Sequence, residues 1–308
     1  MKKIHCFGVA VVDVLSGPLE QYPVPRLKPL VTTKWVRTTT GGGAANAPAA
    51  LARMGLAVSS YFKVGDDFNG KFIRGELQEL GVDLSGVCVS PSDITPFTFV
   101  GILADGDRTF IHTPGANTTY CLEDVKNESL LACDFLLYHD LFVMPKIDGK
   151  PAASLLAEAQ KRGVTTFLDQ DFGYGPNQEQ LEAMLPYCDY VTPSYEELLT
   201  IYPGTSPAQM ADRLLAQGAR AAVLKMGRDG CLVARGAERI YVPALSAKLV
   251  DTTGAGDCWD AGFMAALALG EDLPTAARVG NACAAFCIEG VGGATGIPNY
   301  AAVRLRAA

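Results

Sequence analysis

The 308-residue chain lacks any apolar run of the roughly 18 residues that a membrane-spanning helix requires, and it lacks blocks of like charge. Its net charge of -7 is spread without a basic patch, which argues against nucleic acid or an anionic membrane as a partner. The apolar start of the chain is short and closes at Asp13, which predicts a buried first strand rather than a signal peptide. We therefore expect a cytoplasmic protein.

Paired metal ligands are also absent. The nine cysteines are scattered without a CxxC pair, and the three histidines lie far from any such pair, so a zinc site is not indicated. We predict buried thiols in a reducing compartment. The GxxxxGK[ST] sequence of P-loop kinases is missing, and the glycine-rich run at 290–296 does not have the GxGxxG spacing of a dinucleotide site.

The chain instead alternates short β-branched runs with helical patterns, which predicts an α/β fold with a mostly parallel sheet covered on both faces. A composition of 49% hydrophobic and 19% charged residues suits one well-buried domain spanning 1–308. Strands are predicted at Ile4–Val12, Ser59–Val64, Phe135–Tyr138, Thr165–Leu168, Tyr190–Thr192, Ala221–Lys225 and Cys231–Ala234. Helices are predicted at Ala47–Met54, Gly70–Leu80, Ala152–Arg162, Glu179–Leu185, Glu196–Ile201, Ala208–Gln217, Asp257–Leu269 and Pro274–Ile288.

Two segments break this alternation. Residues 24–40 carry apolar side chains without a helical period, and residues 95–113 predict a hairpin with its turn at 105–107. Together they predict a small antiparallel β-sheet, built from about 14–40 and 95–113, that stands off the main domain. Such a sheet would serve as a lid that excludes water from a reaction. The alternative is that these strands extend the central sheet.

The motif with the clearest chemistry is the loop Asp251-Thr-Thr-Gly-Ala-Gly-Asp257, which leads into an apolar helix. Glycines at the start of a helix let backbone N–H groups converge on an anion, and the helix dipole adds positive potential. Gly254, Ala255 and Gly256 are therefore candidates for stabilising a transferring phosphoryl group, and Asp257 is a candidate base for a hydroxyl. The alternative is that Asp257 only charges the first helical turn.

A second glycine-rich segment runs from Thr40 to Asn46 and enters a helix. Its glycines permit close approach of the backbone to a bound group, and Asn46 offers both donors and acceptors. Asn46 is equally explained as a helix N-cap. Asp13 follows the first predicted strand, where side chains face the usual crevice of an α/β sheet.

These motifs resemble the ribokinase-like (PfkB) carbohydrate kinase family, whose signature is D-T-x-G-A-G-D followed by a helix. The resemblance extends from about residue 4 to Pro298. It implies a three-layer αβα fold with a small β-sheet lid, ATP and Mg²⁺ as cofactors, a sugar hydroxyl as acceptor, and a homodimer formed through the lid. In that family the final aspartate, here Asp257, is the catalytic base and the G-A-G before it is the anion hole.

The resemblance also assigns the remaining site residues. Asp13, Gly42, Gly43 and Asn46 match segments that hold the sugar, although ribokinases carry lysine at the position of Gly43, and Asn117 is a weaker candidate. The nucleotide segments match Ser194, Lys225, Gly227, Gly230 and Asn281.

Metal sites follow from the same resemblance. Glu197 matches the glutamate that organises Mg²⁺ through water, although Ser194 replaces the usual asparagine and the pair also reads as a helix capping box. Asp251 and Thr253 match positions that bind a monovalent cation such as K⁺ in relatives. Gly296 stands where ribokinases often have serine, which puts activation by K⁺ in doubt.

The identity of the acceptor stays open at this point. His139 or Asp140 could contact it, and a turn histidine is as good an explanation. One alternative function is a nucleoside kinase of the same fold, with a base stacked on Phe97, Phe99 or Phe110. Another is a sugar-binding regulatory protein without turnover, although the intact loop before Asp257 speaks against it.

Overall fold

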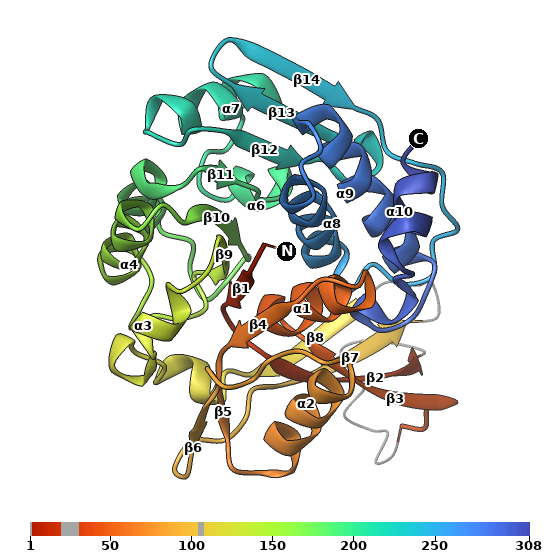
Figure 1. The fold of residues 1–308 in the computed structure, drawn as a ribbon. Coiled ribbons are helices and arrows are strands. Elements are labelled where there is room, and N and C mark those ends of the chain that lie inside the picture. The colour runs from red at the N-terminus through yellow and green to blue at the C-terminus, as the bar shows by residue number, and fades with distance from the viewer. Residues whose placement is uncertain (1, 20–30, 104–107) are drawn as a thin grey trace.

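The computed structural model describes residues 2–19, 31–103 and 108–308 (Figure 1). In this part of the chain a large sheet has the strand order β14-β13-β12-β11-β10-β9-β1-β4, with parallel pairing from β12 to β4 and antiparallel pairing of β12, β13 and β14. The mostly parallel sheet is therefore confirmed. Its strands are β1 (Ile4–Phe7), β4 (Val58–Tyr61), β9 (Phe135–Leu141), β10 (Thr165–Gln170), β11 (Tyr190–Val191), β12 (Ala222–Lys225), β13 (Cys231–Arg235) and β14 (Glu238–Val242).

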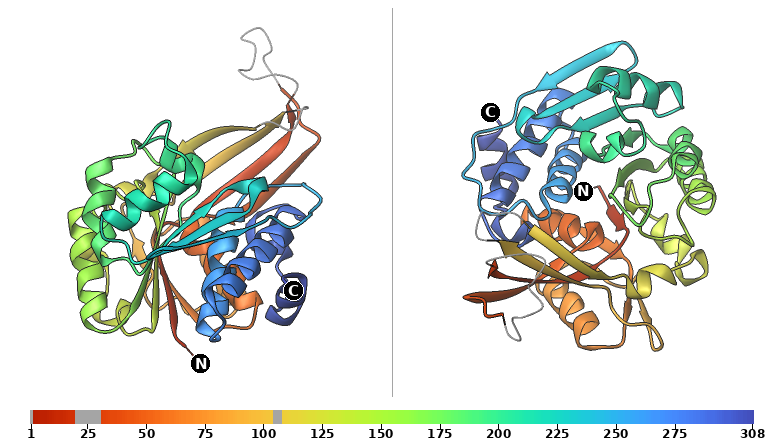
Figure 2. Two further views of the ribbon diagram at one scale, coloured as in Figure 1. Left: turned by 90° about the horizontal axis from the view of Figure 1, so that it is seen from above. Right: turned by 180° about the vertical axis from the view of Figure 1, so that it is seen from behind.

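Helices cover both faces of this sheet (Figures 1 and 2). Successive side chains of a strand point to opposite faces, and on β9 Leu137 joins one hydrophobic cluster whereas Leu136 and Tyr138 join the other. The first cluster includes α1 (Gly43–Arg53), α8 (Ala255–Ala268) and α9 (Leu273–Ile288), and the second includes α4 (Lys150–Lys161), α5 (Gln178–Met184) and α7 (Pro207–Ala216). The remaining helices are α2 (Phe68–Glu79), α3 (Asn127–Leu130), α6 (Tyr195–Leu199) and α10 (Tyr300–Arg306).

A second, small sheet has the order β3-β2-β7-β8, formed by β3 (Trp35–Gly41), β2 (Val11–Leu19), β7 (Phe97–Leu103) and β8 (Arg108–Thr113). Figure 2 shows its strands extending away from the large sheet. The prediction of a separate small sheet is confirmed, but the prediction that it is antiparallel is wrong, because β2 and β7 pair in parallel. The predicted turn at 105–107 lies outside the described residues.

The predicted strand Ile4–Val12 is in fact two strands in two sheets. β1 ends at Phe7 in the large sheet, and β2 begins at Val11 in the small one. The break falls at Gly8, where a Cβ would lie 2.6 Å from Asp140 Oδ2, so the chain approaches β9 closely at this point. The predicted strand Ser59–Val64 is likewise divided between β4 and β5 (Lys63–Gly65), and β5 pairs with β6 (Cys88–Ser90).

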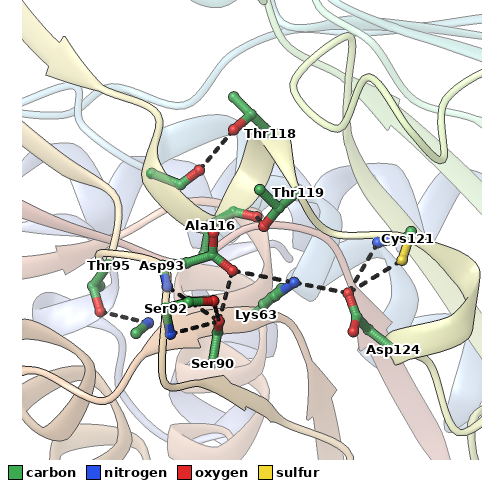
Figure 3. A network of polar contacts seen from close by, with 12 residues as sticks. Lys63, Ser90, Ser92, Asp93, Thr95, Ala116, Thr118, Thr119, Cys121 and Asp124 are labelled. Carbon is green, nitrogen blue, oxygen red and sulfur yellow. Dashed lines mark hydrogen bonds and ion pairs between the residues drawn. The ribbon is translucent and has the colours of Figure 1, made fainter.

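A polar network fixes the base of the small sheet (Figure 3). Lys63 Nζ lies 2.9 Å from Asp124 Oδ2 and 3.3 Å from Asp93 Oδ2, and Ser90 donates to Asp93. The Lys63 side chain is largely buried, so these contacts are shielded from solvent. They join β5 and β6 to the segments on either side of β7 and β8.

All nine cysteines are free thiols, as predicted. No helix among the described residues has the length and apolar content needed to cross a membrane.

Candidate active site

A cavity of about 880 Å³ opens beyond the carboxyl ends of β10 and β12, where ligands usually bind in open α/β sheets. Ten of the residues predicted for catalysis, nucleotide binding or magnesium line it together: Gly254, Ala255, Gly256, Asp257, Ser194, Glu197, Lys225, Gly227, Gly230 and Asn281. These positions span almost 90 residues of sequence, so the fold gathers them in one place.

The start of α8 forms one wall of this cavity. Gly254 is its N-cap with φ 72°, and a Cβ there would lie 2.9 Å from Asn46 Nδ2 and 3.0 Å from the backbone of Gly293, so glycine is required on both conformational and steric grounds. The N–H groups of the first turn have no intrahelical acceptor and face the cavity end of the helix. Asp257 lies in this first turn, with its side chain 20% exposed.

Asn46 positions Asp257. Its Nδ2 donates to Asp257 Oδ2 at 2.8 Å, which joins α1 to α8 across 211 residues of sequence. The alternative that Asn46 is an N-cap is wrong, because Gly42 occupies the N-cap of α1 with φ 83° and Asn46 lies inside the helix. The amide is therefore directed at the carboxylate rather than at its own helix end.

Asp13 lies on the small sheet and not at the end of a strand of the large sheet, so the strand-end prediction is wrong. It is buried on β2, opposite Thr39 of β3 and Thr98 of β7. Burial, opposed by a hydrogen bond from Thr98 and aided by the charge of Asp257, raises the pKa of Asp13 to about 7. A Cβ at Gly41 would come within 2.1 Å of Asp13 Oδ2, so this glycine makes room for the carboxylate.

The register of the small sheet decides which of its side chains accompany Asp13. Thr98 of β7 and His112 of β8 continue the row, linked by a hydrogen bond of 3.0 Å between Thr98 Oγ1 and His112 Nδ1. Phe97 and Phe99 flank Thr98 and therefore point to the opposite face. Phe110 shares the face of Asp13, and stacking of a base on any of these phenylalanines stays a prediction.

His139 and Asp140 end β9 directly behind the site. His139 is 0% exposed, and its Nδ1 lies 3.8 Å from Asp257 Oδ1 and 3.6 Å from Asp169 Oδ2. Asp140 has φ 60°, an uncommon conformation for a residue other than glycine, and its carboxylate accepts the N–H groups of Val9 and Gly43. The backbone strain thus serves to bring three chain segments together.

Sequence reasoning missed a buried ion-pair network beneath the cavity. Lys225 Nζ lies 2.9 Å from Asp169 Oδ2 and 3.0 Å from Asp260 Oδ2. Burial alone would raise the pKa of Asp169, but the charge of Lys225 and the nearby imidazole of His139 hold it well below its usual range. Burial and the charge of Asp169 raise the pKa of Asp260. An aspartate three residues after Asp257 on an apolar helix was the available signal, because a buried carboxylate needs a partner.

The predicted capping box is present at the start of α6. Ser194 Oγ accepts the N–H of Glu197, and Glu197 Oε2 accepts the N–H of Ser194, both at 3.1 Å. Glu197 also lines the cavity. Burial, followed by the charge of Asp169, raises the pKa of Glu197 to about 8. The magnesium role of Glu197 stays a prediction.

Asn281 lines the cavity, but its amide is used within the protein. Its Oδ1 accepts Trp259 Nε1 at 2.7 Å, and its Nδ2 donates to the carbonyl oxygens of Val242 and Pro243. Gly230, with φ 88°, packs so tightly that a Cβ would lie 2.0 Å from the Val242 oxygen. Both residues thus shape a wall of the cavity, and their contact with a nucleotide stays a prediction.

Eight predicted residues are not among those that line this cavity: Asp13, Gly42, Gly43, Asn46, Asn117, His139, Asp251 and Thr253. Asp251 and Thr253 lie in the loop before α8, and Asp251 Oδ2 accepts the N–H of Gly292 at 2.9 Å. Asn117 lies in a short 3₁₀ helix (Gly115–Thr118) that follows β8, and it is buried.

A model of the pfkB family of carbohydrate kinases matches residues 1–299. The chain belongs to this family. It is 30% identical over 273 residues to an ATP-dependent ribose-1-phosphate kinase of Halopiger xanaduensis, covering 87% of this chain and 86% of that protein. It is 27% identical over 303 residues to a ribokinase of Bacillus subtilis, covering 97% of both.

Solved structures agree on the fold. The structure of Arabidopsis thaliana ribokinase complexed with ribose and ATP superimposes with a TM-score of 0.87 at 24% identity, covering 99% of this chain and 98% of that one. Thermotoga maritima ribokinase superimposes with a TM-score of 0.85 at 23% identity, covering 99% of both chains. The interpretation as a carbohydrate kinase with a ribokinase-like fold is therefore confirmed.

Proposed function

We propose that this pfkB-family kinase moves the γ-phosphoryl group of ATP to a hydroxyl of a sugar or sugar derivative, with Asp257 as the base. The observation that carries the proposal is the position of Asp257. It lies in the first turn of α8, is held by Asn46, and borders the large cavity. A carboxylate next to converging backbone N–H groups can accept a proton where a phosphoryl group is held.

The reaction needs two kinds of assistance from the chain. Asp257 accepts the proton of the acceptor hydroxyl. The oxygen of that hydroxyl then bonds to the γ-phosphorus, while the bond between the γ-phosphorus and the leaving ADP oxygen breaks. The backbone N–H groups of Gly254, Ala255 and Gly256 face the charge on the transferring group. Lys225 adds to this potential, because its Nζ lies 3.3 Å from the point where a Cβ of Gly256 would stand.

Asp13, Gly42, Gly43 and Asn46 are the proposed acceptor side of the site. Asp13 reaches it from β2 of the small sheet and Asn46 from helix α1, and both are buried. The carboxylate oxygens of Asp13 can accept hydrogen bonds from hydroxyl groups, and the short amide side chain of Asn46 can donate or accept them. The pair therefore suits a ligand with several hydroxyl groups. We retain Asn117 as a weaker candidate on this side.

We propose ATP with Mg²⁺ as the phosphoryl donor, with Glu197 as the group that places the metal. The raised pKa of Glu197 fits this role, because a buried carboxylate is stabilised by a nearby cation. Magnesium keeps several of its waters, so one carboxylate can position it. When bound, the ion would neutralise charge on the phosphate oxygens.

We further propose K⁺ at the loop containing Asp251 and Thr253. The Cys287 thiol donates to the carbonyl oxygens of Thr253 and Gly293, at 3.3 Å and 3.2 Å, so these two backbone oxygens lie close to one another beside the loop. Backbone carbonyls are the ligands that K⁺ takes in selective sites. Asp251 ties this loop together by accepting the N–H groups of Thr253 and Gly292.

We propose a cytoplasmic homodimer formed through the small sheet. Its outer strands β3 and β8 carry Val36, 67% exposed, and Ile111, 55% exposed. Exposed apolar residues on edge strands favour pairing with another chain. The free thiols suit a reducing compartment.

A coupled assay of ADP release tests the kinase proposal over pentoses, hexoses, ketoses, sugar acids, phosphosugars and nucleosides. Asp257→Asn should retain ATP binding and lose turnover by about 10²–10⁴-fold, the range typical of a general base. Asp66→Asn, on the exposed surface, is the matched control and should keep wild-type turnover. Comparable turnover in Asp257→Asn would show that another group is the base, and tight sugar binding without any ADP release would favour a binding protein.

A further inference from the structure

The two oxygens of Asp257 have different neighbours. Oδ2 accepts the amide of Asn46, whereas Oδ1 faces His139 Nδ1 at 3.8 Å. The same imidazole nitrogen is 3.6 Å from Asp169. Both distances exceed hydrogen-bonding range, and neither ring nitrogen has a hydrogen-bond partner among the described residues. The imidazole therefore acts on the two carboxylates through its charge.

Two glycines make the space that this ring fills. A Cβ at Gly43 would lie 2.4 Å from His139 Cγ and 2.6 Å from Nδ1, and a Cβ at Gly8 would lie 2.9 Å from His139 Cβ. Real Cβ atoms do not approach other atoms so closely. A side chain at position 43 and an imidazole at position 139 are thus mutually exclusive, and the ring occupies the volume into which a residue at 43 would extend.

Four carboxylates lie near the imidazole ring of His139. Asp140 follows it on β9, Asp169 lies on β10, and Asp257 and Asp260 face it from α8, whereas Lys225 on β12 is paired with Asp169 and Asp260. Burial lowers the pKa of His139, but the nearby carboxylate of Asp169 and the charges of Asp257 and Asp140 outweigh it and raise the pKa to about 9.

His139, Asp169 and Asp257 offer ligand atoms within 4.8 Å of one another, which raises the alternative of a metal ion between them. Lys225 Nζ already lies 2.9 Å from the same oxygen of Asp169 that faces His139. A second cation at that point would be repelled by the ammonium group. A proton on His139 therefore explains the arrangement better than a metal ion.

We propose that His139 is a positioning residue for Asp257, holding the carboxylate oriented toward the acceptor hydroxyl. This inference rests on the proposed function, in which Asp257 is the base. The carboxylate is clamped between the amide of Asn46 on one oxygen and the imidazolium on the other. The burial of His139 favours this role over the direct acceptor contact predicted from the sequence, because a fully enclosed ring reaches the acceptor only through Asp257.

The pH dependence follows from the signs of the charges. His139→Gln should remove an alkaline decline of kcat/KM near pH 9, where the wild-type imidazolium loses its proton. We expect kcat to fall by roughly 10–100-fold, while the KM for ATP changes less than about threefold.

A charge-relocation variant separates this role from simple packing. His139→Gly removes the ring together with its Cβ, which would lie 2.5 Å from a Cβ at position 43, and adding Gly43→Lys to it places a cation in the vacated volume. We expect the double variant to recover at least about tenfold of the lost kcat. His5→Gln, at another buried histidine on β1, is the control and should leave the pH profile unchanged. A His139→Gln profile that superimposes on wild type, or a double variant no faster than His139→Gly, would overturn the proposal.

Nuclear magnetic resonance provides a test that does not depend on turnover or on folding of the His139 variants. The chain has only three histidines, so their ring resonances can be assigned and titrated individually. In Asp257→Asn the pKa of His139 should fall by about one unit or more, because one of its stabilising charges is lost. An unchanged titration would refute the coupling even if Asp257 proves to be the base, whereas active Asp257→Asn would refute the proposed function alone.

Discussion

Replacing Lys225 with methionine tests the buried ion-pair network most directly. Methionine has a similar length and fills the space of the lysine stem, but it leaves Asp169 and Asp260 without the ammonium that lies about 3 Å from each. The loss is therefore of charge rather than of packing. Removing one partner of a buried pair destabilises a protein by about 3–5 kcal/mol.

The pH dependence of this effect has a definite sign. In the wild type the folded pKa of Asp169 is held low, so its contribution to stability is present above the unfolded value of about 3.9 and is lost as pH falls through the folded pKa. Without Lys225 the two carboxylates repel each other, and one of them takes up a proton at a higher pH. The stability deficit of Lys225→Met should therefore shrink as pH falls from 7.5 to 5.5.

Thermal unfolding at both pH values measures the deficit. For a domain of this size, about 2 °C of Tm corresponds to 1 kcal/mol, so we expect a loss of about 6–10 °C at pH 7.5. Lys225→Met with Asp260→Asn should recover part of it, because one unpaired charge is removed. Lys71→Met breaks an exposed ion pair and should change Tm by less than about 2 °C. A small deficit at pH 7.5, or one that grows on acidification, would refute the reasoning.

Three further tests concern the site and the assembly. Gly43→Ala should lower kcat at least about tenfold, because its Cβ displaces the buried ring of His139, whereas Gly75→Ala, where a Cβ meets nothing within 4 Å, should be silent in the same assay. Replacing tetramethylammonium chloride with KCl should raise kcat of the wild type but not of Asp251→Asn. Equal wild-type rates in the two salts would contradict the proposed K⁺ site. Light scattering should find a dimer that Val36→Asp with Ile111→Asp converts to a monomer, and a wild-type monomer at micromolar concentration would contradict the dimer.

The sequence allowed the fold class and the loop before Asp257 to be predicted because both are local patterns. Short apolar runs that alternate with helical patterns indicate strands buried in a parallel sheet. Glycines directly before an apolar helical pattern indicate where a helix begins. The division of the first strand was not predictable in this way. Gly8 interrupts a continuous apolar run, and its requirement arises from Asp140, a residue 132 positions later. Asp13 was consequently expected on the wrong sheet.

Other features also depend on long-range contacts. Phe97 and Phe99 are equivalent to Thr98 in any local pattern, and only pairing with β2 shows that they face away from Asp13. Asn281 was predicted on the nucleotide side, and the sequence did not indicate that Trp259 and two backbone carbonyls use its side-chain amide. Such roles depend on which polar atoms a neighbouring element supplies.

The passage of the chain from β1 into β2 also has a consequence for how acceptor preference can change during evolution. Asp13 belongs to the small sheet, whereas Asp257 and the cavity beside it belong to the helices and strands of the large sheet. If Asp13 contacts the acceptor as proposed, exchanges within β2, β3, β7 and β8 would alter acceptor preference while leaving the cavity beside Asp257 unchanged. A chimaera that takes these four strands from a relative would then transfer the part of that preference which the small sheet determines.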